Sequence, residues 1–194
     1  AAGPLLDQWF GINPPWWTIA LAGWAITAVL GLLRVDLNGT VLAVLLVAEV
    51  AVIGVYSLTS LAHPAGGHLA LDALSPANLT GPGAGAILVL AVLGFVGFES
   101  AVVFSEESRD PETTVPRATY LSVTIIAILY TLAAWSMTVA VGPDQVVTAS
   151  REQGTELIFT LAGTHLGSFA ATLGHTLFVT SLIAAMISFH GTTS

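Results

Sequence analysis

The chain has 194 residues, of which 55% are hydrophobic and only 8% are charged, whereas an ordinary soluble domain carries about 25% charged residues. Its formal net charge of -8 argues against a nucleic-acid-binding protein, which needs a basic surface. The absence of cysteine excludes disulfides, thiolate metal sites and cysteine nucleophiles. This composition predicts an integral membrane protein whose main partner is the lipid bilayer.

Taken in chain order, five apolar stretches are long enough, or nearly so, to form membrane spans. A helix needs about 20 predominantly apolar residues to cross the hydrocarbon core of a bilayer. Lipid offers no hydrogen-bond partner to the backbone, so stretches of this length must be helices, and we expect an all-α fold. We expect a single transmembrane unit over residues 1–194, an internal piece of a longer protein, with spans at 16–33, 41–61, 86–104, 120–141 and 169–189.

The arginines set the expected orientation of these spans. Successive spans alternate in direction, so the loops at 34–40 and 105–119 face the same side, and they hold three of the four arginines. Cytoplasmic loops carry an excess of basic residues. We therefore expect both loops in the cytoplasm and the protein in the plasma membrane.

Two local predictions concern the segments on either side of the fourth span. Proline is favoured at the first position of a helix, so Pro116 is expected to open that span at its first turn. Residues 156–162 read Glu-Leu-Ile-Phe-Thr-Leu-Ala. They are expected to form a short amphipathic helix that lies on the outer surface.

The third span holds the most informative residue, Glu99. An ionisable group at membrane depth costs about 2.5–3.5 kcal/mol and marks a substrate or proton site by default. Gly94 and Gly97 precede it, three residues apart rather than the four of close-packed helix dimers. They predict a break in the helix or a close approach to a ligand. Phe95 and Phe98 then either line a pocket or pack in the core. The alternative is an unbroken helix in which Glu99 only bonds a neighbouring helix.

Other polar residues inside the spans carry weaker signals. Glu49 is the second acid within a span, and a structural role is favoured for it because no glycine lies beside it. Ser181 is a candidate sodium ligand, although hydroxyls in membrane helices usually bond their own backbone. His63 and His68 lie in a loop without further ligands at a useful spacing, so neither a metal site nor a cofactor is predicted.

The third span and the loop after it resemble the amino acid–polyamine–organocation transporters. The sixth helix of that family carries Gly-Phe-Glu near its middle, as residues 97–99 do here. Its next loop typically reads Glu-x-Arg-Asp-Pro and then Val-Pro-Arg-Ala, which matches residues 107–111 and 115–118. The resemblance implies that the chain covers roughly the fourth to eighth helices of an inverted-repeat fold. That fold has two five-helix repeats, with broken first and sixth helices around a central site.

The resemblance also implies a function: secondary active transport of amino acids or related amines by alternating access, and no enzyme activity. Proton symport or exchange is favoured over sodium coupling. The lysine that replaces sodium in some members has no counterpart, because the chain lacks lysine. Glu99 is implied in proton coupling or gating. Binding of the small-molecule substrate through the backbone is implied for Gly94, Phe95, Val96, Gly97 and Phe98.

Two other functions are compatible with an apolar helical chain. In a structural or receptor-like membrane subunit, Glu99 would only pair with a partner helix. A membrane enzyme would need clustered His, Asp or Glu at one membrane face, and the sequence shows no such cluster. Transport is therefore the favoured interpretation.

Overall fold

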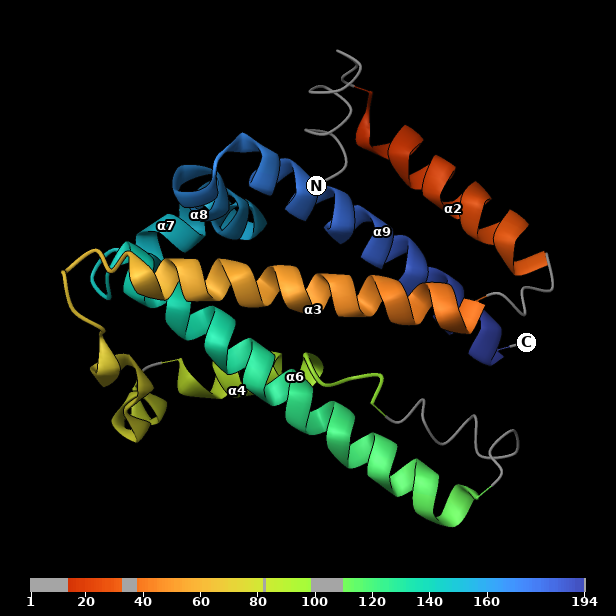
Figure 1. The fold of residues 1–194 in the computed structure, drawn as a ribbon, viewed down its shortest axis with the longest axis horizontal. Coiled ribbons are helices and arrows are strands. Elements are labelled where there is room, and N and C mark those ends of the chain that lie inside the picture. Colours follow the sequence, from red (N-terminus) through yellow and green to blue (C-terminus); the bar gives the residue numbers. More distant parts are fainter. Residues whose placement is uncertain (1–13, 33–37, 82, 99–109, 194) are drawn as a thin grey trace.

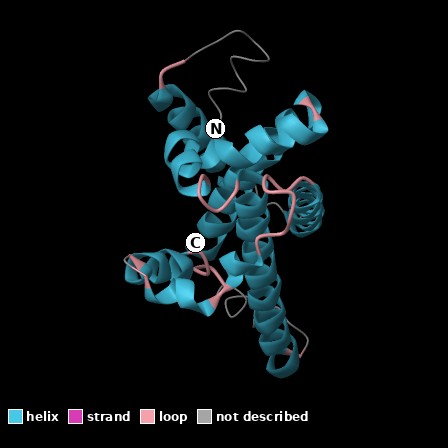
Figure 2. Cartoon of the chain, turned by 90° about the vertical axis from the view of Figure 1, so that its left-hand side faces the viewer, coloured by secondary structure: helices cyan, strands magenta, loops and turns pink. Residues whose placement is uncertain are grey.

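The computed structural model describes residues 14–32, 38–81, 83–98 and 110–193. The regular elements among them are all helical, and none of these residues forms a strand (Figure 2). The described residues include three short 3-10 helices, η1 (Leu71–Leu74), η2 (Pro76–Thr80) and η4 (Gly154–Glu156). The α-helices are α2 (Trp16–Leu32), α3 (Asn38–Ala62), α4 (Ala84–Leu93), α6 (Pro111–Val141), α7 (Val146–Gln153), α8 (Leu157–Leu166) and α9 (Ser168–Thr193).

Helix α3 lies at the centre of the bundle (Figure 1). It packs against α6 on one side and against α8 and α9 on the other, and α2 lies along α9. The packing of α3 against α9 brings the second and the last predicted spans into contact, although more than a hundred residues separate them in the chain.

Among the described residues, three helices are long and apolar enough to cross a membrane, through the segments Ala43–Ala62, Pro111–Val141 and Ser168–Met186. Many of their large apolar side chains are exposed on the bundle, such as Leu58 and Phe169. Lipid tails are as apolar as these side chains, so the exposure suits a bilayer. The predicted all-α membrane fold is confirmed. The predicted spans at 16–33 and 86–104 correspond to α2, with 17 residues, and α4, with 10 residues.

Helix α6 begins at Pro111 and not at Pro116, so the prediction for the start of this helix is wrong. Pro111 is one of the first helical residues, where the missing N–H costs nothing. The Thr113 hydroxyl donates to the Asp110 carboxylate at 2.6 Å just before it. Pro116 lies inside the helix and forgoes a backbone hydrogen bond to the carbonyl of Glu112. Both prolines fit the rule for a helix start, and the rule alone could not choose between them.

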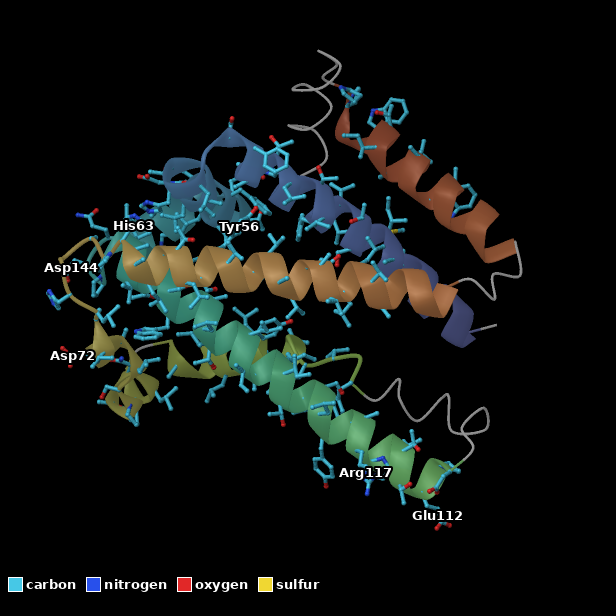
Figure 3. All side chains as sticks on the ribbon, viewed as in Figure 1. Tyr56, His63, Asp72, Glu112, Arg117 and Asp144 are labelled. Atoms are coloured by element: carbon cyan, nitrogen blue, oxygen red, sulfur yellow. The ribbon has the colours of Figure 1, made fainter. Side chains whose placement is uncertain are left out.

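Polar side chains gather at the two ends of α6. The helix has 31 residues, which makes it about 46 Å long at 1.5 Å per residue, whereas the hydrocarbon core is about 30 Å thick. Glu112 and Arg117 lie at one end of α6, and Asp72 and Asp144 lie near the other (Figure 3). The segments that hold these two pairs therefore lie at opposite ends of the bundle.

The predicted short helix near residues 156–162 is present as α8. Its side chains Leu157, Phe159 and Ala162 are buried, and the helix packs against α3 and α9. The prediction of a helix is confirmed. The helix was also predicted to lie on the outer surface. This is wrong for its apolar face, because that face contacts other helices of the bundle.

The core of the bundle lies where α3, α8 and α9 meet. Tyr56, Phe159 and Ala162 form its buried cluster, with Tyr56 pointing from α3 toward α8 and α9 (Figure 3). The Tyr56 hydroxyl donates to the carbonyl of Ala170. Gly174 of α9 is buried beside them, and a Cβ atom there would lie 2.7 Å from Tyr56 Oη and 2.9 Å from Phe159 Cδ1. The helices pack this closely because residue 174 has no side chain.

Candidate functional site

Helix α4 stops at Leu93, and the next five residues form consecutive turns. The amides of Phe95 and Val96 donate to carbonyls three residues earlier, at 3.0 and 3.2 Å, instead of four residues earlier as in an α-helix. Gly97 has a φ of 107°, in the region that side-chain-bearing residues avoid. The interruption predicted from the glycine pair is therefore present.

Tyr130 of α6 contacts the first residue of this interruption. Its hydroxyl donates to the Gly94 carbonyl oxygen at 3.0 Å. Its ring meets the ring of Phe95 edge-on, with 6.0 Å between the centroids. A Cβ atom on residue 94 would lie 3.0 Å from Tyr130 Cε2. Glycine at position 94 thus allows the close approach of the two chain segments.

The other predicted site residues differ in their surroundings. Val96 and Phe98 are 61% and 43% exposed, so these side chains are not packed in the core. Glu99, the predicted proton-coupling or gating residue, lies outside the described residues. The structure thus describes the break that precedes Glu99.

A second polar contact joins α3 and α9, and sequence reasoning missed it. The Ser181 hydroxyl donates to Glu49 Oε2 at 2.9 Å. Ser181 was predicted as a candidate sodium ligand, and Glu49 was given a structural role. Their pairing has no local signal, because 132 positions separate them. The only indication available from the sequence was that each is a polar residue inside an apolar span.

A cavity of about 470 Å³ adjoins this contact, between α3, α6, α8 and α9. Glu49 and Ser181 line it on one side, and the aromatic residues Tyr56, Phe159 and Phe178 line it elsewhere. Tyr130 also lines it, so one side chain contacts both the cavity and the break at Gly94. The two polar features are therefore neighbours in the structure.

Two contacts of histidine residues lie at the end of the bundle that holds η4. His175 Nε2 lies 2.6 Å from the Glu156 carboxylate, and the His175 ring packs on Phe159 with 4.1 Å between centroids. The rings of His63 and His165 stack at 4.5 Å. Burial, and then the charge of His63, lower the pKa of His165. Within the described part of the chain, no group of three or more His, Cys, Asp or Glu could hold a metal ion.

Comparison with known proteins gives the family. The family model described as amino acid permease matches residues 1–193. The chain belongs to the amino acid permease family. No curated protein and no solved structure matches it significantly. Membership, together with the three long apolar helices found among the described residues, identifies this permease as an integral membrane protein that transports amino acids. The family resemblance seen in residues 97–118 is confirmed.

Proposed function

We propose that this chain is the central part of a secondary active transporter that moves amino acids or related amines by alternating access. The observation that carries the proposal is the interruption after Leu93. Helix α4 has 10 residues, so it extends about 15 Å and crosses about half of the hydrocarbon core. Discontinuous helices that end inside the membrane are the usual substrate sites of such transporters.

The substrate binds, in this proposal, at residues 94–98 through the backbone. The C-terminal end of α4 carries the negative end of the helix dipole, which favours the ammonium group of an amino acid. The three-residue turns at Phe95 and Val96 have poorer hydrogen-bond geometry than α-helical bonds and can be exchanged for bonds to the substrate. The exposed side chains of Val96 and Phe98 then contact the substrate directly.

Glu99 follows the break and serves, in this proposal, as the proton-coupling or gating group. Protons are favoured over sodium in this proposal because a carboxyl group at such a site can bind and release a proton during the transport cycle. The positive-inside rule supports cytoplasmic loops at 34–40 and 105–119 in a plasma-membrane protein. The polar groups at opposite ends of α6 (Figure 3) agree with loops on two different sides.

The test is amino acid uptake by the transporter that contains this chain, reconstituted in liposomes, with Gly94→Ala as the variant. The new Cβ lies 3.0 Å from Tyr130 Cε2 and 3.3 Å from the Ala91 carbonyl oxygen, so Tyr130 and the break must shift. We expect the KM for the transported amino acid to rise about tenfold, or 1.4 kcal/mol. Gly85→Ala is the matched control on the same helix, because nothing lies within 4 Å of its Cβ.

Two results would overturn the proposal. Absence of amino acid uptake by the wild-type transporter would refute transport itself. Equal KM values for the two alanine variants would move the substrate site away from Gly94.

A further inference from the structure

The cavity beside Glu49 has a chemistry that the proposed backbone site does not use. Among the described residues that line it, Glu49 alone carries a carboxyl group, and none is an arginine or a histidine. No arginine or histidine of the described chain lies within 4.0 Å of the Glu49 carboxyl group. Among the described residues, the neutral hydroxyl of Ser181 donates to this carboxyl group at 2.9 Å. The cavity therefore offers a carboxyl group that no cation of the described residues pairs with.

The remainder of the lining suits the apolar part of a cationic ligand. Val52 and Ile53 of α3 and Leu177 of α9 supply aliphatic surface. Phe178 and Phe159 supply aromatic rings, which attract ammonium and guanidinium groups. An apolar pocket with a few well-placed polar groups is the usual form of a small-molecule site. The volume of about 470 Å³ accommodates a flexible chain of several methylene groups.

Tyr130 connects this cavity with the break in the third span. The same side chain lines the cavity and donates its hydroxyl to the Gly94 carbonyl at 3.0 Å. A substrate whose α-amino and carboxylate groups lie at residues 94–98 can therefore extend its side chain past Tyr130 into the cavity. Glu49 also lines that cavity.

We propose that the Glu49 cavity receives the cationic side chain of the substrate, so that the transporter prefers basic amino acids such as lysine over neutral ones of the same length. This inference rests on the proposed function, because it needs a substrate bound at the break. It adds the substrate class and assigns Glu49 as the residue that determines it. Ser181 is then a positioning residue, since it holds one carboxylate oxygen.

The experiment compares lysine with norleucine, which has nearly the same length and lacks the side-chain ammonium group. Inhibition constants are measured against uptake of a labelled amino acid by the reconstituted transporter. In the wild type we expect lysine to bind at least tenfold more tightly than norleucine. Nε-acetyllysine, whose side chain is uncharged, should bind no better than norleucine. This part needs no variant, so it does not depend on how a substitution folds.

Glu49→Gln is the variant that assigns the residue. It keeps the size of the side chain and removes the negative charge, so lysine should lose at least tenfold in affinity while norleucine keeps its own. The matched control is Glu152→Gln, which removes an exposed acid on α7 and should leave both constants unchanged.

Each outcome separates this inference from the proposed function. Equal affinities of lysine and norleucine in the wild type would overturn the cationic-side-chain pocket, while uptake of norleucine would still uphold transport. A parallel loss of both ligands in Glu49→Gln would show that Glu49 stabilises the fold and does not select the substrate. No uptake of any amino acid would refute the proposed function as well.

Discussion

Substitution of Gly174 by alanine tests the packing that holds α9 against α3 and α8. The new Cβ would lie 2.7 Å from Tyr56 Oη and 2.9 Å from Phe159 Cδ1, closer than atoms approach in ordinary contact. Neither neighbour can move away easily, because Tyr56 is 5% and Phe159 7% exposed. The Tyr56 hydroxyl is also bonded to the Ala170 carbonyl. The clash therefore falls on the core of the bundle.

The expected change in the free energy of unfolding is the difference between two opposing effects. Alanine in a helix interior is favoured over glycine by about 1 kcal/mol, whereas overpacking of a filled core costs about 1–3 kcal/mol. Gly163→Ala is the matched control, because its Cβ would lie 3.5 Å from Ala171 Cβ, an ordinary contact. This control gains the helix preference without the clash. Gly174→Ala should thus be less stable than Gly163→Ala by about 1–3 kcal/mol.

The assay is thermal unfolding of the purified protein in detergent, followed by intrinsic tryptophan fluorescence. For a chain of this size about 2–4 °C of melting temperature corresponds to 1 kcal/mol. The middle of the expected range of destabilisation is about 2 kcal/mol. Gly174→Ala should therefore melt roughly 4–8 °C below Gly163→Ala. Tyr56→Phe removes the nearest clashing atom, so it should destabilise the Gly174→Ala background less than the wild type. Equal melting temperatures of the two alanine variants would refute the reasoning.

Two further predictions concern groups that titrate. Glu99→Gln should abolish pH-driven accumulation by the transporter, because glutamine keeps the size of the side chain but cannot exchange a proton. The affinity for the substrate should change by less than about tenfold, or 1.4 kcal/mol. Unchanged pH-driven uptake would give Glu99 a structural role. Burial and then the charge of His63 lower the pKa of His165 below 6.5, so between the lowered pKa and 6.5 the unfolded chain binds more protons than the folded one. Stability from this group is present above pH 6.5 and is lost as the pH falls through that range. The fall in melting temperature from pH 7.5 to 5.5 should therefore be smaller in His165→Asn than in the exposed control His68→Asn. Equal falls in the two variants would show that the stacked pair of His63 and His165 does not cause this loss of stability.

The sequence determined the features of this protein that depend on composition and on neighbouring residues. The length of the apolar stretches predicted helical membrane spans, because lipid offers the backbone no hydrogen-bond partners outside the helix. The break after Leu93 was predictable because the pair Gly94 and Gly97 acts through local backbone preferences. The sequence motif at residues 97–118 was sufficient for the family. The start of α6 was missed because Pro111 and Pro116 both satisfy the same local rule.

Tertiary structure alone decided which distant side chains meet. Glu49 and Ser181 lie 132 positions apart, and Tyr130 and Gly94 lie 36 apart, so no periodic pattern links either pair. The close contact at Gly174 likewise depends on how α9 crosses α3 and α8, and an isolated glycine in an apolar span gives no sign of its neighbours. In a membrane the hydrophobic effect does not select between helix faces. The pairing of these helices, and with it the Glu49 cavity, is therefore set by packing and hydrogen bonds that appear only when the helices are assembled.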